Sequence, residues 1–193
     1  MEPPTLSVRH LTRAELEAGL DAIRSAPRDA GVVQMIVRRP ALGEREVLDR
    51  GEVDVVEGFV GDTWRSRGNH RTSDGLAHPG TQVTIMGART IALIATDASR
   101  WPLAGDQLFV DLHLGVENLP PGTCLEIGSA VLQVSAEPHT GCGKFVKRFG
   151  VDAMKFVNSP VGRSLGLRGI NAKVVRNGVI RVGDTARKQS VLR

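Results

Sequence analysis

The sequence has no tyrosine, only two cysteines and no long hydrophobic run in its 193 residues. Two cysteines, Cys124 and Cys142, are too few for the disulfide framework of a small secreted domain, so we expect both to be reduced thiols. The longest apolar runs, such as residues 91–95 and 108–110, are far shorter than the roughly 20 residues of a membrane-spanning helix. The N-terminus lacks the basic start and apolar stretch of a signal peptide. We therefore expect a soluble, cytoplasmic protein with no membrane partner.

Positive charge is only slightly in excess: the sequence has 25 Lys plus Arg and 21 Asp plus Glu, for a formal net charge of +4. Arginine dominates the basic set, and its planar guanidinium suits phosphate. The charge fits either an ordinary, mildly basic protein or a face that binds phosphate-bearing ligands. Because tyrosine is absent and no dense basic stripe or recognition-helix motif occurs, nucleic acid is not an expected partner. No Walker loop or dinucleotide glycine fingerprint occurs, and the scattered cysteines and histidines lack zinc-ligand spacing.

Apolar periodicity predicts one helix followed by many short strands. Leucine and isoleucine at near-helical spacing predict a helix over about residues 7–26. Strands are expected at 32–37, 45–48, 52–56, 82–86, 108–114, 124–127, 130–136, 170–175 and 179–182. A long polar loop is expected over 58–80, and further helices over 89–95 and 144–157. Asn177-Gly178, between the last two strands, is a strong β-hairpin signal.

Many short strands with few long helices favour a mainly β fold, a barrel or sandwich with peripheral helices. The length fits one large domain, so we expect a single domain over residues 1–193, with its core over about 30–190.

The first candidate site is the segment Glu137-Pro-His-Thr-Gly-Cys-Gly-Lys144. Glycines on both sides of Cys142 allow close approach of a substrate. The thiol precedes a predicted helix and lies near Lys144 and Arg148, a setting that favours the thiolate. We therefore expect Cys142 to be reactive and Cys124 to be a structural thiol. For His139 three roles are open: a general base for Cys142, a donor to a ligand anion, or a loop histidine satisfied by backbone.

The second candidate site is the loop Gly61-Asp-Thr-Trp-Arg-Ser-Arg-Gly-Asn-His-Arg71. Arginines can bind an anion with two hydrogen bonds each, and an indole can stack on a flat heterocycle, so the loop fits a phosphorylated aromatic ligand or is simply a solvated basic loop. His78 closes the same stretch. Arg168 and Asn171, in a glycine-spaced turn before a predicted strand, could add another anion contact or form a structural turn.

Several motifs together resemble the MOSC family, the domain named for the C-terminal part of molybdenum cofactor sulfurase. They are Asn118-Leu-Pro-Pro-Gly-Thr-Cys-Leu-Glu-Ile-Gly-Ser-Ala-Val-Leu-Gln-Val134, Pro138 with Cys142-Gly-Lys144, Arg148-Phe-Gly150, Leu167-Arg-Gly-Ile-Asn-Ala-Lys-Val-Val175, Gly178-Val-Ile-Arg-Val-Gly-Asp184, Gly58-Phe-Val-Gly-Asp62 and Trp101-Pro-Leu-Ala-Gly-Asp-Gln107. The resemblance covers roughly residues 30–190. Two details depart from the family: His-Thr-Gly stands directly before the cysteine, and the loop 69–80 matches the family's His-Gly-Gly type loop only loosely, so that His70 and His78 are both candidates for its histidine.

The resemblance implies an α+β, MOSC-type β-barrel with peripheral helices that binds the molybdenum cofactor, molybdopterin. The family's key cysteine, which carries sulfur or ligates molybdenum, corresponds to Cys142, with His139 and Lys144 beside it as catalytic candidates. The residues expected to bind the cofactor are Asp62, Trp64, Arg65, Arg67, Arg71, His78, Arg148, Arg168 and Asn171.

The resemblance also implies a separate partner protein. A pyridoxal-phosphate-dependent cysteine desulfurase would supply sulfur, or a redox partner would supply electrons. Three alternatives stay open: a non-catalytic module that binds or delivers the cofactor, a molybdenum-dependent reductase component acting on N-hydroxylated compounds, and a diverged barrel that has lost the cofactor. The sequence leaves open whether the chain is an enzyme by itself.

Overall fold

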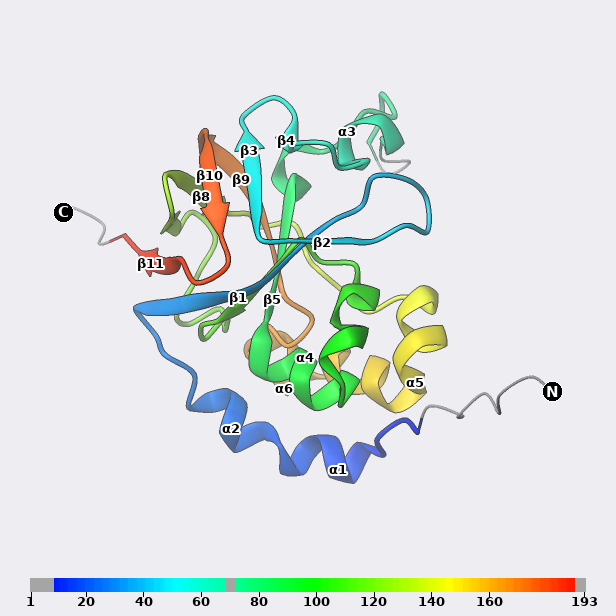
Figure 1. Ribbon diagram of the computed structural model, residues 1–193. Helices are drawn as coiled ribbons and strands as arrows, with labels where there is room; N and C mark the ends of the chain where they lie inside the picture. The colour runs from blue at the N-terminus through cyan, green and yellow to red at the C-terminus, as the bar shows by residue number, and fades with distance from the viewer. Residues whose placement is uncertain (1–8, 69–71, 190–193) are drawn as a thin grey trace.

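The central feature of the computed structural model, which describes residues 9–68 and 72–189, is a closed β-barrel (Figure 1). Within the described residues seven strands close the ring, in the spatial order β1 (Ala30–Arg38), β6 (Leu108–Asp111), β5 (Val83–Gly87), β9 (Ile170–Arg176), β8 (Ala130–Val134), β7 (Cys124–Ile127) and β11 (Thr185–Lys188). β5 and β6 pair in parallel, and the other neighbours are antiparallel. The predicted β-barrel with peripheral helices is confirmed.

The long strand β1 closes the barrel because different parts of it pair with different strands. Its first residues pair with β11, its middle pairs with β6, and its last residues, Ile36 to Arg38, pair with β2 (Glu46–Leu48) outside the ring. The connection from β1 to β2 therefore leaves the barrel as a hairpin at one side.

A second, small sheet consists of β10 (Gly178–Arg181), β3 (Arg50–Asp54) and β4 (Gly58–Phe59). The predicted hairpin at Asn177-Gly178 is therefore wrong, because β10 pairs with β3 and not with β9. A type I′ hairpin turn needs positive φ at both central residues, and neither Asn177 nor Gly178 has it. The Asn177 side chain instead accepts from the backbone N–H of Val55 and donates to Asp54. These two hydrogen bonds hold the β9–β10 connection against the end of β3, where the chain passes from the barrel to the small sheet.

Two hydrophobic cores form on the two faces of the barrel strands. Successive side chains of a strand point to opposite faces, so Leu108 and Ile85 lie in the barrel interior while their neighbours Phe109 and Met86 face outward. The outward residues form a second core with the helices. This is why β5 is buried at every position, with no alternation of buried and exposed residues.

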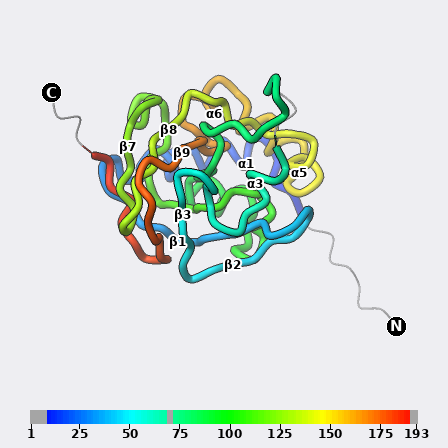
Figure 2. The backbone as a smooth tube through the Cα atoms, turned by 90° about the horizontal axis from the view of Figure 1, so that it is seen from above, coloured from blue at the N-terminus to red at the C-terminus, as the bar shows by residue number. Residues whose placement is uncertain are grey.

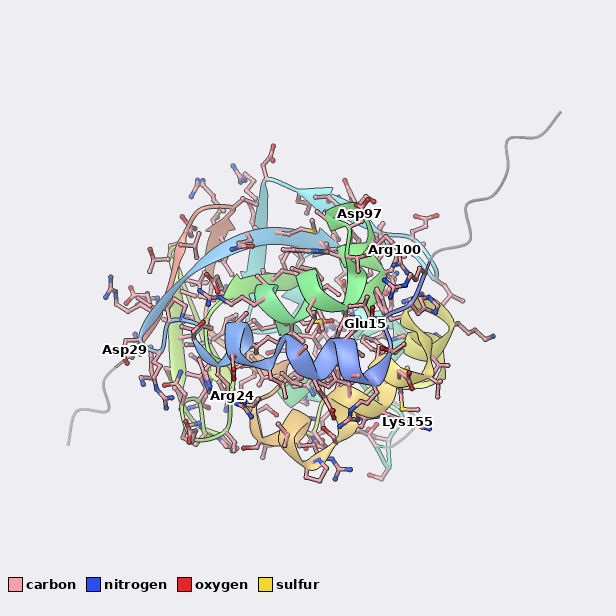
Figure 3. The ribbon with its side chains drawn as sticks, turned by 90° about the horizontal axis from the view of Figure 1, so that it is seen from below. Glu15, Arg24, Asp29, Asp97, Arg100 and Lys155 are labelled. Carbon is pink, nitrogen blue, oxygen red and sulfur yellow. The ribbon has the colours of Figure 1, made fainter. Side chains whose placement is uncertain are left out.

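The helices cover one side of the barrel (Figure 3). They are α1 (Arg13–Ala18), α2 (Leu20–Arg24), α4 (Ala88–Ala95), α5 (Gly143–Asn158), α6 (Pro160–Ser164) and the 3₁₀ helix η2 (Ala98–Ala104). In Figure 3, α1, which carries Glu15, runs beside α5, which carries Lys155. α5 is broken at Gly150, where φ is 88° and the ring of His10 packs against the backbone, an approach that a Cβ atom would block.

Three segments differ from the sequence-based expectation. The N-terminal helix is two short helices that meet at Gly19. The long loop contains the short helix α3 (Trp64–Arg67) and the 3₁₀ helix η1 (Pro79–Thr81). β11 and α6 were not predicted from the sequence, because each is short and has no clear periodicity. Among the described residues, no helix has both the length and the apolar character needed to cross a membrane.

Candidate functional site

A large pocket lies beside the barrel, where the β1–β2 connection meets α3, the end of η2 and the start of α5. Figure 1 shows the blue β1–β2 loop, α3 and the yellow α5 on the same side of the molecule, and Figure 2 agrees from above. The pocket has a volume of about 700 Å³. This size lies within the range of ligand and cofactor sites.

The pocket lining is strongly basic, and we call it the cationic pocket. None of its described lining residues is Asp or Glu, whereas seven are cationic: Arg39, Arg45, Arg67, Lys144, Lys147, Arg148 and Arg168. Arg39 and Arg168 are paired with buried aspartates. The other five have no ion-pair partner in the part of the chain that the structure describes. Cations gathered around one cavity raise the local potential and favour an anionic ligand.

Arg39, directly after β1, is held in place by Asp62. Its Nε and Nη2 donate to the two carboxylate oxygens of Asp62 at 2.8 Å each, and its Nη1 donates to the Gly105 carbonyl at 2.9 Å. The Asp62 side chain is fully buried. A bidentate pair of this kind fixes the plane of the guanidinium group. Asp62, which the sequence suggested as a cofactor-binding residue, does not line the pocket; it fixes Arg39, which does.

Arg168 is held by a second buried carboxylate. Its Nη1 donates to Asp106 at 2.7 Å and its Nη2 to the Ala104 carbonyl at 3.1 Å, while its guanidinium carbon lies 5.1 Å from the centre of the Phe145 ring. The Asp106 side chain is fully buried. Through these contacts Arg168, which lies just before β9, links the end of η2 to Phe145 of α5, and its guanidinium group lines the cationic pocket.

His139 contacts the same carboxylate from the other side. Its Nδ1 lies 3.5 Å from the second Asp106 oxygen. Burial and the positive charge of Arg168 lower the pKa of His139 to about 3, although Asp106 acts in the opposite direction. The imidazole is therefore neutral at neutral pH and is a weak base. This arrangement favours a hydrogen-bonding role over proton abstraction from a thiol.

Cys142 lies exposed at the edge of the cationic pocket and is the N-cap residue of α5. Burial on its own would raise the thiol pKa. The backbone N–H groups of Phe145 and Lys144 and the charges of Arg168 and Lys144 outweigh burial, so the pKa of Cys142 is lowered. A lowered pKa and an exposed sulfur are the two properties of a reactive cysteine.

The backbone beside Cys142 is held by the far end of its own helix. The Asn158 side chain accepts from the Gly141 N–H at 2.9 Å and donates to the Gly141 carbonyl at 3.0 Å. These two bonds fix the segment that enters α5. The orientation of Cys142 toward the cationic pocket therefore depends on a residue 16 positions later in the chain.

Several residues predicted for the cofactor site lie elsewhere. Trp64 is 5% exposed, so its ring offers no open face for stacking, and its Nε1 donates to Thr81. Arg65 pairs with Glu57 outside the pocket lining. His78 caps η1 by accepting from Gly80, and its Nε2 faces Glu137 at 3.6 Å. None of these three residues lines the cationic pocket, because burial, pairing and local capping occupy their functional groups.

The remaining predictions divide into three groups. Arg67, Lys144, Arg148, Arg168 and Cys142 come together in the cationic pocket as expected. Asn171 and His139 line a neighbouring cavity instead. The predicted residues Arg71 and His70 lie outside the described part of the chain.

Arg39, Arg45 and Asp106 were not predicted from the sequence as site residues. Arg39 follows the β-branched run of β1 directly, and Arg45 lies in the turn after it, so a basic cluster at a strand end was the available signal. The Nε of Arg45 is buried without a hydrogen-bond partner among the described residues. Burial and the nearby charges of Arg148 and Arg39 lower the pKa of Arg45.

Comparison with solved structures shows the same fold in bacterial proteins. The YuaD protein from Bacillus subtilis superposes with a TM-score of 0.59 at 17% identity, over 84% of this chain and 97% of that one. YiiM from Escherichia coli has a TM-score of 0.53 at 18% identity, over 83% of this chain and 71% of that one. No curated protein matches the chain significantly. At such identities the likeness concerns the fold alone.

The family comparison is more direct. The family model described as MOSC domain matches residues 78–187, which include β5 to β11, Asp106, Cys142 and Arg168. The match spans more than half of the sequence, and the chain therefore belongs to the MOSC domain family.

Proposed function

We propose that this protein binds an anionic, phosphate-bearing molybdenum cofactor of the molybdopterin type in the cationic pocket, and that Cys142 presents its thiolate to that cofactor as a molybdenum ligand or a sulfur carrier. The observation that carries the proposal is that five cations with no ion-pair partner among the described residues and one exposed thiol of lowered pKa surround a single cavity. The MOSC domain is associated with this cofactor in general.

The residues present fit such a group. A pterin phosphate needs several N–H donors that are not already neutralised, and the pocket supplies guanidinium and ammonium groups without a carboxylate in its described lining. The Nε atoms of Arg45 and Arg168 are buried without partners among the described residues. Buried polar groups are normally hydrogen-bonded, so an unmet donor beside a cavity suits a ligand that accepts. The volume of about 700 Å³ accommodates a ligand of this size.

The side chains divide into holding and presenting roles. Arg45, Arg67 and Arg148 come from three different segments and would hold the phosphate end. Arg39 and Arg168 are fixed by buried aspartates, so they would orient the ligand without reorganising. Cys142 presents a thiolate, with Lys144 beside it to stabilise the negative charge. When bound, the cofactor supplies the redox and sulfur-binding chemistry.

A separate protein would supply sulfur or electrons. The exposure of Cys142 supports this part of the proposal, because a partner can reach a thiol at the mouth of a pocket. A cysteine desulfurase is the expected donor if Cys142 carries sulfur. A redox protein is the expected donor if Cys142 ligates molybdenum in a reductase that acts on N-hydroxylated compounds.

The test is cofactor retention. The protein is purified from cells that make molybdopterin, and bound molybdenum and pterin fluorescence are measured. Cys142→Ser is the informative variant because serine also caps a helix, and Cys124→Ser is the matched control. We expect the wild type and the control to retain both pterin and metal, and Cys142→Ser to retain pterin and lose most of the molybdenum if the thiol is a ligand.

A second measurement distinguishes a role of Cys142 as a sulfur carrier from a role as a molybdenum ligand. The protein is incubated with a cysteine desulfurase and cysteine, and protein-bound sulfane sulfur is measured. Sulfur on the wild type and on Cys124→Ser, but not on Cys142→Ser, identifies a persulfide carrier. Absence of pterin and metal from the wild type would overturn the cofactor-binding proposal, and absence of bound sulfur as well would overturn the role of Cys142.

A further inference from the structure

A second cavity, of about 210 Å³, lies next to the cationic pocket and shares Arg168 with it. Its walls come from the stretches 114–121, 134–140, 157–163 and 166–171. Most of its lining is apolar, including Leu114, Leu119, Val134 and Ile170. We call it the apolar cavity. An apolar cavity of about 150 Å³ is enough to hold benzene, so this one has room for a single ring with a short substituent.

Two hydrogen-bond acceptors lie in this apolar lining. The Asn171 side-chain nitrogen donates to the Glu137 carbonyl at 3.1 Å, which fixes the amide and leaves its oxygen without a hydrogen-bond partner among residues 9–68 and 72–189. Asn171 is 5% exposed, so this oxygen belongs to a buried group. The oxygen is not among the fully buried unpaired atoms of the described residues, so it keeps access to the cavity and a ligand donor can reach it.

His139 supplies the second acceptor. Its Nδ1 faces the Asp106 carboxylate, so a proton on Nδ1 leaves the Nε2 lone pair as an acceptor. Within the described residues Nδ1 is buried 3.5 Å from Asp106 without a full hydrogen bond, and no hydrogen bond is made by Nε2, which is not among the fully buried unpaired atoms. The low pKa of about 3 keeps the imidazole neutral, so this residue adds no charge to the cavity wall.

The charges around the apolar cavity select against charged ligands. Arg163 and Arg168 line it and disfavour a cation, while Glu137 disfavours an anion. An uncharged molecule avoids both penalties and also loses less hydration on entering an apolar space.

We infer that the apolar cavity is a binding site for a small, uncharged, single-ring molecule that donates a hydrogen bond to the side-chain oxygen of Asn171, with the neutral His139 beside it in the wall. The ligand would lie on the other side of the His139–Arg168 wall from the cationic pocket. This inference does not depend on the cationic pocket holding a cofactor, because the cavity and its acceptors are formed by the chain itself.

The test uses two probes of nearly equal shape, aniline and toluene, because only aniline carries an N–H donor. Each is titrated into the full-length protein while backbone amide NMR shifts are followed. We expect shifts confined to the segments 114–121, 134–140 and 162–171. We also expect aniline to bind about tenfold more tightly than toluene, the ratio expected for one hydrogen bond inside a largely apolar cavity.

Three variants sharpen the result. Val116 is 53% exposed and lines the apolar cavity, so Val116→Trp should fill its entrance and weaken both probes at least tenfold. Val175 is 43% exposed and is not in that lining, so Val175→Trp is the matched control and should leave both affinities unchanged. Asn171→Leu should bring aniline to the affinity of toluene, while unchanged toluene binding shows that the cavity still forms.

The opposite results are equally clear. Failure of both probes to bind the wild type at millimolar concentration would overturn the inference. Equal affinity for aniline and toluene would also overturn it, as would shifts that map to the cationic pocket.

Discussion

The cationic pocket and the apolar cavity share one arginine and differ in almost every other respect. The first is about 700 Å³ and carries seven cations, and the second is about 210 Å³ and mostly apolar. Arg168 lines both, and its charge is neutralised by Asp106 behind it. The strong charge of the cationic pocket therefore comes from residues on its rim, such as the partly buried Arg45 and the exposed Lys147, that have no carboxylate partner among the described residues.

This difference indicates how the two sites are separated. The wall between them contains Arg168, Asp106 and His139, in which one full ion pair and one neutral imidazole face each other. A neutralised wall lets one side attract anions while the other stays suited to uncharged molecules. If this description is correct, changes at the wall should affect both sites, and changes on the rim should affect only one.

The largest effect is expected from Asp106→Asn, which removes the charge that neutralises Arg168. Breaking a buried ion pair from one side costs about 3–5 kcal/mol, because the remaining charge stays buried without a partner. We expect a loss of this size in the free energy of unfolding, measured by urea denaturation. Both ligand sites should also lose affinity, since Arg168 would lose its fixed position.

An exposed pair provides the control for that measurement. Arg176 and Glu126 form an ion pair at 3.1 Å with side chains 53% and 45% exposed. Glu126→Gln should change the free energy of unfolding by less than about 1 kcal/mol, as exposed pairs do. A similar small effect of Asp106→Asn would contradict the assignment of the wall as a buried, charge-balanced cluster.

The second effect concerns the rim. Arg45→Gln removes an unpaired cation of the cationic pocket, and a hydrogen bond to a charged group contributes roughly 1.5–3 kcal/mol. Pyrophosphate binding, measured by calorimetry at low salt, should therefore weaken about tenfold or more. Arg163→Gln, on the apolar cavity, should change it less than about twofold. Equal losses from both variants would show that pyrophosphate responds only to net charge and not to the cationic pocket.

The third effect tests the neutrality of His139. Its pKa is about 3 in the folded protein against an ordinary value of 6.5, so between these values the unfolded chain takes up a proton that the folded chain does not. Above pH 6.5 the free energy of unfolding therefore does not depend on the protonation of His139. As the pH falls from 6.5 toward 3 the free energy of unfolding decreases, by up to about 1.4 kcal/mol per pH unit.

His139→Gln should remove this part of the pH dependence. Urea denaturation of both proteins at several values from pH 4 to pH 7 gives the difference, in which the carboxylates common to both cancel. The neighbouring charges of Asp106, Arg168 and Arg39 remain in both proteins. Parallel pH profiles for the wild type and the variant would contradict a neutral, buried His139.

The barrel itself could be predicted largely from the sequence. Its strands are short apolar runs between turn residues, and segments such as Cys124–Ile127 have the predicted bounds. The strand order could not be obtained in this way, because pairing depends on contacts between distant segments. The Asn177-Gly178 turn is an example: its local signal indicated a hairpin, but β3 pairs with β10 instead.

The candidate site was predictable only in part. Cys142 was found because glycines and cations surround it in the sequence. The buried aspartates that fix Arg39 and Arg168 were not recognised as positioning residues, since each pair joins segments far apart in the chain, 23 residues apart for Arg39 with Asp62 and 62 residues apart for Arg168 with Asp106. Trp64 was expected to offer its ring for stacking, but the ring is buried. Composition alone does not distinguish an exposed ring from a buried one.

The smallest effect is expected at Cys142, on the rim of the cationic pocket. Its thiol pKa lies below that of a free cysteine, because the N–H groups at the start of α5 and the charges of Arg168 and Lys144 outweigh burial. In a Cys124→Ser background only Cys142 reacts, and its rate of alkylation by iodoacetamide should rise with pH to a midpoint below that of a free cysteine. Lys144→Gln should move the midpoint upward, because one of the charges that stabilises the thiolate is gone. Lys155→Gln, near the other end of α5, should leave the midpoint in place; an equal shift from both variants would mean that the thiolate senses the overall charge of the protein and not the pocket.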